Sequence, residues 1–408
     1  MTKTQPHSSA AAVVTGLGAV TAWGRDLDDF WQGLLAGAGA ISKPERFDPS
    51  GHRTELASEV PASALGGRGA RSTADDFALS AALDAWRDAR LDGAGVEPGR
   101  VGVFFGGSTA AMAEGEDFFK RLVDTDPAWP RVSLVASHPL NGPGDAVARA
   151  VGARGPVESV SSACASGGLA IGAALDALRA GEVDVAVAGG SDSLCHLTYA
   201  GFNALRAVDA RHCRPFRAGR AGLNLGEGAG VVVLELEAHA ARRGARVWGR
   251  VLGSGASCDA HHMTAPHPQG EGAARAIGAA LEDAGLAPDA IGFINAHGTG
   301  TPLNDRAESA AVRSVFGERA AELPLTSTKG LIGHFLGSSG AIEAVASLLC
   351  LHHGFVHPTP GDAAADPALG VDLVVGAPRA VDRRAAVSTS FAFGGSNAAV
   401  VFAGSEAP

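Results

Sequence analysis

Residues 157–179 read VESVSSACASGGLAIGAALDALR. A short run with β-branched residues is followed by a turn of small residues, and the turn by an Ala/Leu-rich run of helical period. We predict a strand over Val157–Val160 and a helix over Gly167–Arg179, with Cys164 in the turn that joins them.

The same alternation continues along the whole chain. Further strands are predicted at Ala12–Leu17, Val101–Phe105, Val183–Ala188, Gly230–Leu236, Val247–Leu252, Ile291–Asn295, Leu323–Thr326, Ala385–Thr389 and Ala398–Phe402. Further helices are predicted at Ala74–Arg90, Gly272–Ala284 and Gly340–His352. Short strands that alternate with helices of this length indicate an α/β fold in layers.

The two halves of the chain repeat one another faintly. The segment 82–108, with ALDAWRDARL and then VGVFFGGS, resembles the segment 280–298, with ALEDAGL and then IGFINAHG. Later in each half, a turn of small residues precedes an Ala-rich helix. Chance similarity in an Ala/Gly-rich chain is the alternative. We predict a duplicated unit, with one half over residues 1–245 and the other over 246–408.

The composition excludes several classes of protein. The 408 residues include 33 Lys and Arg against 43 Asp and Glu, a formal net charge of -10, and 46% of them are hydrophobic. Binding to a nucleic-acid backbone needs a basic surface, and disorder needs few apolar residues, so neither fits. The sequence contains no run of ~18 apolar residues and no signal peptide is evident, so we expect no membrane association.

The five cysteines are scattered and odd in number, which argues against a framework of disulfide bonds and favours the reducing cytoplasm. Cys164 is distinctive because it comes just before a helix. The helix macrodipole and the free backbone N–H groups there favour a thiolate, the nucleophilic form. A free cysteine is as often a small buried hydrophobe, so both interpretations stay open for this residue alone.

Two histidines occupy glycine-rich turns in the second half. His297 lies in NAHGTGTPLND at 295–305, at the end of a predicted strand, and His334 lies in KGLIGHFLG at 329–337, before a predicted helix. Such turns direct a side chain toward a cleft. One histidine of this kind is compatible with a core position, but two of them favour a functional site.

In combination and in order, these motifs resemble those of the β-ketoacyl-acyl-carrier-protein synthases, condensing enzymes of the thiolase fold, and especially the elongating type II enzymes. The resemblance runs from VVTGLG at 13–18 to SFAFGGSN at 390–397. It implies an α/β, thiolase-like fold with duplicated βαβαβαββ halves in a five-layer α-β-α-β-α arrangement. It also implies an acyltransferase that extends a fatty-acid, polyketide or polyene chain by two carbons, through decarboxylative Claisen condensation with malonyl-carrier protein.

The resemblance assigns roles to the matching residues. Cys164 would carry the acyl group, and the backbone N–H groups of Cys164 and Phe393 would form the oxyanion hole. His297 and His334 would be neutral and would donate from Nε2 to the enolate that forms when the malonyl thioester loses CO2.

Supporting and substrate-binding residues follow from the same resemblance. Lys329 and Glu343 would form a charged pair that keeps the second histidine oriented and neutral. A pantetheine arm would bind to hydroxyl groups, and a mobile aromatic loop would gate the cysteine. The substrate-binding residues would be Thr299, Thr301, Phe216, Phe391, Phe393 and Thr109. An ordinary Gly-Thr turn and core phenylalanines are the alternatives.

Two segments depart from the family pattern. The family commonly has Asp after Arg-Pro-Phe and then Arg-Asp-Gly-Phe, whereas this chain has Arg217 at the first position and AGLN after Arg220. This change in local charge slightly favours a specialised polyketide or polyene pathway over primary fatty-acid synthesis. The segment 106–112 lacks the bulky aliphatic residue that often limits chain length, so we expect a pocket for a longer or unusual acyl chain.

An acidic enzyme needs a local basic patch to bind an acidic carrier protein. The residues expected to dock the acyl carrier protein are Arg68, Arg71, Lys120, Arg121 and Arg206. Arg206 also begins an arginine-rich run that continues with Arg211, Arg214, Arg217 and Arg220. A merely solvated surface is the alternative for these charges. Because the fold normally dimerises, we expect a homodimer, or a heterodimer with a chain-length-factor-like subunit.

No cofactor is expected, because phosphopantetheine arrives on the carrier protein. Cys258, His261 and His262 are close in the sequence, but zinc sites usually have four ligands in two spaced pairs, so we expect no metal. A thiolase would need a second cysteine in the C-terminal glycine turn, where this chain has FGGS at 393–396. A chain-length-factor-like scaffold would typically lack the nucleophile.

Overall fold

The computed structural model describes residues 12–66, 70–124, 132–381 and 385–405, and within these ranges 11 strands form one large sheet. These strands are β1 (Ala12–Val20), β3 (Val101–Gly106), β4 (Val157–Val160), β5 (Val185–Asp192), β7 (Gly228–Leu236), β8 (Gly249–Cys258), β9 (Ile291–Asn295), β10 (Pro324–Thr326), β12 (Asp372–Leu373), β14 (Ala385–Phe391) and β15 (Ser396–Gly404). Two small sheets pair β2 (Ala57–Ser58) with β6 (Leu225–Gly226) and β11 (Phe355–Val356) with β13 (Arg379–Ala380).

The large sheet contains one topology twice. The spatial order is β4-β3-β5-β7-β1 in the first half and β10-β9-β14-β15-β8 in the second, where the short β12 adds one more strand outside β10. With β12 left aside, each half has its third, second, fourth, fifth and first strands in that order. In both halves the first three strands of this order are parallel, and the next two are joined by antiparallel pairing. β1 pairs with both β7 and β8, which joins the halves. The predicted duplication is confirmed, while its boundary at residue 245 stays a prediction.

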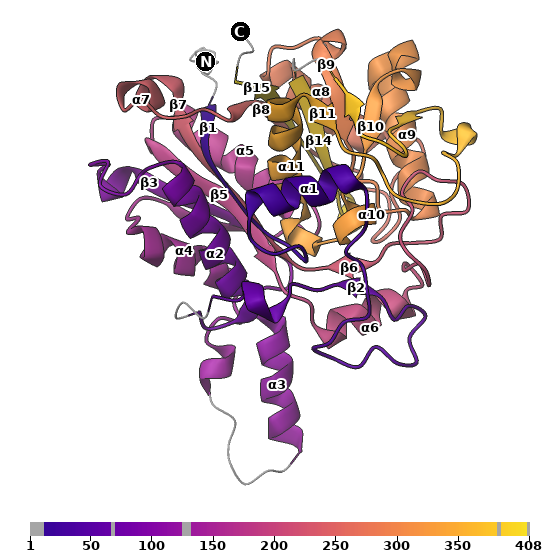
Figure 1. Ribbon diagram of the computed structural model, residues 1–408, viewed down its shortest axis with the longest axis horizontal. Coiled ribbons are helices and arrows are strands. Elements are labelled where there is room, and N and C mark those ends of the chain that lie inside the picture. Colours follow the sequence, from indigo (N-terminus) through magenta and orange to yellow (C-terminus); the bar gives the residue numbers. More distant parts are fainter. Residues whose placement is uncertain (1–11, 67–69, 125–131, 382–384, 406–408) are drawn as a thin grey trace.

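Helices cover both faces of each half-sheet. α2 (Thr73–Asp88) and α4 (Gly142–Val151) pack on the first half, and α8 (Glu271–Asp283) packs on the second with α9 (Pro302–Phe316) against it. α5 (Ser166–Arg179) and α11 (Ser339–His353) lie in the middle, because each contacts strands of both halves (Figure 1). The five-layer arrangement is therefore confirmed.

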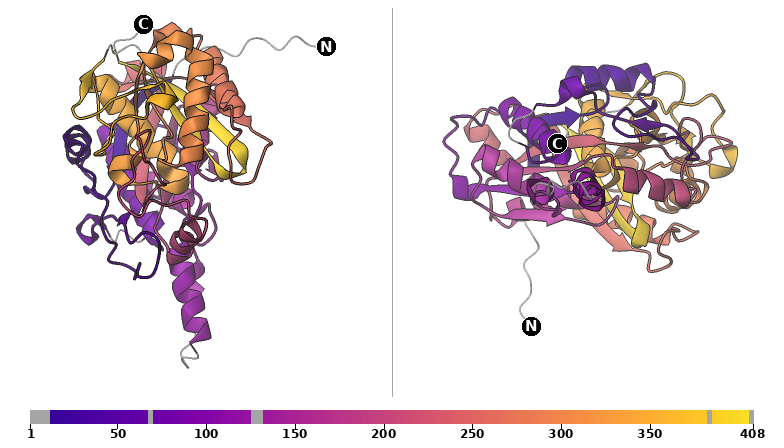
Figure 2. Two further views of the ribbon diagram at one scale, coloured as in Figure 1. Left: turned by 90° about the vertical axis from the view of Figure 1, so that its right-hand side faces the viewer. Right: turned by 90° about the horizontal axis from the view of Figure 1, so that it is seen from below.

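The remaining helices lie around these layers. They are α1 (Leu27–Ala36), α3 (Met112–Val123), α6 (His196–Ala204), α7 (Glu237–Arg242) and α10 (Lys329–Ile332). α3 projects away from the body of the molecule (Figure 2). In the described part of the chain, no helix combines the length and the apolar character that crossing a membrane requires.

The two central helices begin in direct contact, and small residues make this possible. A Cβ on Gly167 would lie 2.7 Å from the backbone nitrogen of Ala341, and a Cβ on Gly340 would lie 2.7 Å from that of Gly168. Larger side chains would push the helices apart. Because Cys164 precedes α5 and His334 precedes α11, this contact brings the two residues together.

All the predicted strands and helices are confirmed, although several of their ends move. The largest difference is in β8, which was predicted to end at Leu252 and ends at Cys258. Its second part has the sequence GSGASC, without the β-branched residues that signal a strand. This part is extended because it pairs with β15 along its whole length, a tertiary contact that local sequence does not reveal.

Candidate active site

Cys164 lies in the turn between β4 and α5, and its sulfur faces a pocket of about 290 Å³. Ala163 has a φ of 45°, a left-handed backbone that residues other than glycine seldom adopt. Ser166 holds this turn, because its Oγ accepts a hydrogen bond from the N–H of Ser162 (2.8 Å) and donates one to the carbonyl of Ala163 (2.6 Å). The strained turn presents the cysteine to the pocket.

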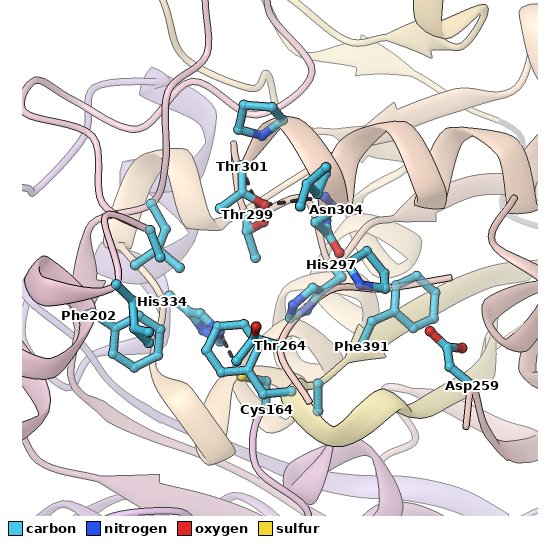
Figure 3. A pocket seen from close by; sticks show the side chains of 18 of the residues that line it. Cys164, Phe202, Asp259, Thr264, His297, Thr299, Thr301, Asn304, His334 and Phe391 are labelled. Atoms are coloured by element: carbon cyan, nitrogen blue, oxygen red, sulfur yellow. Dashed lines mark hydrogen bonds between the residues drawn. The ribbon is translucent and has the colours of Figure 1, made fainter. Parts of the chain in front are cut away.

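Cys164 from the first half and His297 and His334 from the second half line this one pocket (Figure 3). The Nε2 atom of His334 is 3.1 Å from the Sγ atom of Cys164. The centroids of the two imidazole rings are 5.4 Å apart, and the rings are nearly perpendicular, at 84°. The structure therefore brings together the three residues that the sequence proposed as the catalytic set.

Each histidine is anchored from a different direction. His334 follows α10, and its Nδ1 atom is 2.7 Å from Oγ of Ser339, the first residue of α11. His297 follows β9, and its backbone N–H donates to Glu308 Oε1 (2.8 Å) and to Thr389 Oγ1 (2.9 Å). Glu308 and Ser339 were not among the predicted site residues. Glu308 lies on α9 shortly after the GTGTPLND motif. Its closeness to that motif is the sequence signal that points to Glu308.

Lys329 and Glu343 form a fully buried ion pair beside the histidines. Burial and the positive charge of Lys329 hold the pKa of both His297 and His334 well below its usual 6.5, so both imidazoles are neutral near neutral pH. Burial raises the pKa of Glu343 to about 7, while Lys329 acts in the opposite direction. The positive charge of Lys329 therefore helps to lower the pKa of both histidines.

The protonation of Cys164 differs from the prediction. Burial raises the pKa of its thiol to about 12, although Lys329 and the backbone N–H groups of Phe393 and of Cys164 itself favour the thiolate. The start of α5 alone predicted a thiolate, but removal of the sulfur from water outweighs this effect. The two N–H groups that contact the sulfur are the ones expected to form an oxyanion hole.

Thr299 and Thr301 also line the pocket. Their hydroxyl oxygens are 2.9 Å apart, and the Thr301 oxygen caps α9 by accepting the backbone N–H of Asn304 (3.3 Å). Each hydroxyl retains bonding capacity for a further polar group in the pocket.

Aromatic side chains form another part of the pocket wall. Phe391 lies beside His297, with ring centroids 5.9 Å apart. Phe393 stacks on Phe202, with centroids 5.7 Å apart and an angle of 16° between the rings. Phe202 in α6 was not predicted. Gly394, with a φ of 84°, gives the loop that carries Phe393 a backbone that other residues rarely adopt.

Two predicted substrate-binding residues do not reach the pocket. Phe216 is completely buried. Its ring lies directly beneath the His297 turn, since a Cβ added to Gly298 would be only 2.7 Å from it. Thr109 turns its hydroxyl toward Asp192, at 3.0 Å. Neither side chain is among the residues that line the pocket, so the part of both in substrate binding stays a prediction.

The predicted docking residues occupy separate places. Arg206, directly after α6, is exposed and lines the pocket. Arg71 is exposed near the start of α2, and Lys120 and Arg121 are exposed near the end of the projecting α3 (Figure 2). Arg68 lies outside the described residues. Of the four described members of this set, Arg206 is the one that lines the pocket.

The arginine-rich run after Arg206 does not form one surface patch. Arg214 is buried against Asp209, with 2.9 Å between Nη2 and Oδ2. Arg217 is also buried, and it donates to the carbonyl groups of Thr359 and Ala363 in the proline-rich connector, HPTPGDAAADPAL at 357–369. The change of charge at position 217 therefore serves to hold that connector.

The sequence cluster of Cys258, His261 and His262 does not form a metal site. Among the described residues, no three His, Cys, Asp or Glu side chains are grouped so that they could hold a metal ion. The neighbouring Asp259 was not predicted, yet it lines the pocket and accepts a hydrogen bond from Asn397 Nδ2 (2.8 Å) beneath the Phe393 loop.

Family models match both halves of the chain. Residues 10–240 match the model of the β-ketoacyl synthase N-terminal domain, and residues 248–361 match that of the C-terminal domain. The chain belongs to the β-ketoacyl synthase family. The enzyme is therefore an acyltransferase of the condensing type, and the family resemblance read from its motifs is confirmed.

Individual relatives agree with this membership. The 3-oxoacyl-acyl-carrier-protein synthase 2 of Staphylococcus aureus is 37% identical over an alignment of 405 positions, which covers 96% of this chain and 97% of that protein. The solved ishigamide ketosynthase/chain length factor has a TM-score of 0.92 and 33% identity, covering 97% of this chain and 100% of the matched chain. The AntDE:AntF structure, a type II PKS acyl-carrier protein in complex with its ketosynthase bound to the hexaketide, has a TM-score of 0.91 and 31% identity, covering 98% and 100%.

Proposed function

We propose that this β-ketoacyl synthase is a 3-oxoacyl-acyl-carrier-protein synthase in which Cys164, His297 and His334 perform the chemistry. The observation that carries the proposal is the convergence of these three side chains, from both halves of the fold, in one pocket. Among the described residues that line the pocket, Cys164 is the only cysteine. The pocket therefore lacks the second cysteine that a thiolase would use.

The first step moves the acyl group to the enzyme. The Cys164 sulfur attacks the carbonyl carbon of an acyl thioester, the bond to the pantetheine sulfur breaks, and the thiol proton ends on that sulfur. In this proposal the backbone N–H groups of Cys164 and Phe393, both of which favour the thiolate of Cys164, stabilise the negative oxygen of the tetrahedral intermediate. The Nε2 atom of His334 lies 3.1 Å from the sulfur, so a proton on Nε2 can be donated in a hydrogen bond to the developing thiolate.

The second step forms the new carbon–carbon bond. When the malonyl thioester loses CO2, negative charge develops on its thioester oxygen, and neutral imidazoles that donate N–H groups stabilise it. The carbanion attacks the acyl carbon, the bond to Cys164 breaks, and a 3-oxoacyl thioester two carbons longer leaves. The released Cys164 sulfur takes up a proton from water, which restores the thiol. Thr299 and Thr301 supply hydroxyl groups for the pantetheine arm that the carrier protein brings.

In a plot of condensation rate against pH, we expect Lys329→Met to shift the acidic limb to higher pH by at least about one unit. Lys329 lowers the pKa of both imidazoles, so its loss raises both toward 6.5. An imidazolium would protonate the carbanion and end the condensation. The rate should be measured from pH 5 to pH 8. Glu343→Gln is the matched control, because it keeps the lysine and should not move the limb upward; an equal upward shift in both variants would contradict this account.

The acyl carrier protein is the proposed partner, and Arg206 is the proposed contact at the pocket. We expect charge reversal at Arg206, Arg71 or Lys120 to raise KM for carrier-bound substrates about tenfold and to leave KM for small pantetheine thioesters unchanged. Arg242→Glu on α7, far from α6 in Figure 1, is the control. Equal losses with both kinds of substrate would remove docking as the explanation.

A second subunit completes the assembly. β4 is the last strand of the large sheet and Val157 on it is 40% exposed, so its free edge is available for pairing. On the projecting α3, Phe119 is 57% and Val123 is 74% exposed, which also favours a partner surface. The partner is a second copy or a chain-length-factor-like subunit.

All five cysteines are free, which supports the proposed cytoplasmic location.

Reconstitution tests the proposed function. The purified enzyme, an acyl-loaded carrier and a malonyl-loaded carrier should together give CO2 and a 3-oxoacyl carrier two carbons longer. Comparison of acyl chains of different lengths also tests the prediction, from residues 106–112, that long or unusual chains are accepted. Release of CO2 without a longer product from any acyl donor would contradict the proposal.

A further inference from the structure

Two adjacent serines lie at the start of the central helix α11, a few residues after His334: Ser338 is the N-cap and Ser339 is the first helical residue. Both are fully buried. Ser338 Oγ donates to the carbonyl of Phe335 (2.8 Å) and has no contact with the histidine among the bonds of the described residues. Ser339 Oγ lies 2.7 Å from His334 Nδ1. The chain thus places one hydroxyl group against the imidazole and an equivalent hydroxyl group away from it.

The hydrogen bonds fix the position of the imidazole proton. Within the described residues, His334 Nδ1 is the hydrogen-bond partner of Ser339 Oγ. A buried hydroxyl with one neighbouring acceptor donates its proton to that acceptor, because an unused buried O–H is costly. Nδ1 then accepts, so the ring proton of the neutral imidazole is on Nε2 and points at the Cys164 sulfur 3.1 Å away.

In the other tautomer, the hydroxyl group of Ser339 has no acceptor among the described residues, although it is a stronger donor than the thiol of Cys164. With the ring proton on Nδ1, the ring would donate to Ser339 Oγ and the thiol of Cys164 would donate to Nε2. The hydroxyl proton of Ser339 would then have no acceptor in the bonds that the structure gives it. In the first arrangement the unused donor is the thiol, which is a weak donor and faces the pocket. The first arrangement is therefore the stable one.

We infer that Ser339 is a positioning residue that holds His334 in the tautomer with its proton on Nε2. The inference rests on the proposed function for its consequence: only this tautomer gives the enolate oxygen a second N–H donor. Without the hydroxyl group, Nε2 becomes free to act as an acceptor for the Cys164 thiol. Removal of one hydroxyl should therefore impair decarboxylation while it leaves the sulfur as reactive as before, or more reactive.

The tautomer can be read directly in the protein without substrate. In protein labelled with 15N-histidine, an unprotonated imidazole nitrogen resonates far from a protonated one, and His334→Asn identifies the His334 signals. We expect Nδ1 to be the unprotonated nitrogen in the wild type and in Ser338→Ala, and we expect both tautomers in Ser339→Ala. A wild-type proton on Nδ1, or a Ser339→Ala spectrum identical to the wild type, would overturn the inference whether or not the proposed reaction occurs.

Two rates separate positioning from general damage. In Ser339→Ala, release of CO2 from malonyl-carrier protein should fall on the order of tenfold, the effect of one buried hydrogen bond. Alkylation of Cys164 by iodoacetamide should not slow. Ser338→Ala should keep both rates within about twofold of the wild type. Equal losses in the two serine variants, or a proportional fall of both rates in Ser339→Ala, would show a structural role instead.

A second pair of variants covers the case in which Ser339→Ala does not fold. Ser339→Thr keeps the hydroxyl group, and Ser339→Val has the same shape without it. We expect the threonine variant to release CO2 about tenfold faster than the valine variant, the same hydrogen-bond effect. Equal rates for this pair would overturn the inference.

Discussion

Cys164→Ala should lower the rate of condensation by at least about a thousandfold, because the acyl group then has no sulfur to which it can be transferred. The same variant should still release CO2 from malonyl-carrier protein at a rate within about tenfold of the wild type, since both imidazole donors remain. Formation of the 3-oxoacyl product and release of CO2 are measured in parallel.

The control for this variant is Cys258→Ala. Cys258 is exposed and does not line the pocket, so both rates should stay near those of the wild type. Condensation that survives in Cys164→Ala would mean that another group carries the acyl chain. Loss of both activities in Cys164→Ala would mean that the substitution damages the histidines as well.

His297→Ala should have the second largest effect. It removes one of the two proposed donors to the enolate oxygen, and loss of such a donor costs about 10²–10³ in rate. Acyl transfer to Cys164 should fall less than about tenfold, because the sulfur, the backbone N–H groups and His334 stay in place. Single-turnover acylation and CO2 release measure the two steps separately.

His212→Ala is the matched control, because His212 is exposed and lies outside the pocket lining. It should leave both steps unchanged. If His297→Ala slowed acyl transfer as much as CO2 release, His297 would act on the cysteine rather than on the enolate, and the division of roles proposed above would be wrong.

The sequence predicted the fold and the meeting of Cys164, His297 and His334 at one site, because both depend on short local patterns. The strand, small-residue turn and helix around Cys164 are continuous in the chain, and the glycine-rich turns of His297 and His334 are equally local. The repetition of this unit then predicted two halves. Their meeting at one pocket required the contact between α5 and α11, which the glycines at the start of each helix allow.

The predictions that differ from the structure depend on partners far along the chain. Thr109 points away from the pocket because Asp192 accepts hydrogen bonds from the backbone N–H groups of its turn. Phe216 is held below the pocket by a hydrogen bond from its backbone N–H to Asp305 (2.8 Å). Arg217 is buried because carbonyl groups of the proline-rich connector lie within its reach. The start of a helix predicted a thiolate, but no local pattern could reveal that Cys164 is buried enough for its thiol pKa to rise.

Mass spectrometry of the Cys164 peptide in a load-and-chase experiment tests whether Cys164 carries the acyl group during condensation. The wild-type enzyme is first mixed with an acyl-loaded carrier and then with a malonyl-loaded carrier. We predict that the acyl mass appears on the Cys164 peptide and disappears as the 3-oxoacyl carrier forms, at the same rate. An acyl group on another residue, or an acyl group on Cys164 that persists while product accumulates, would contradict the account.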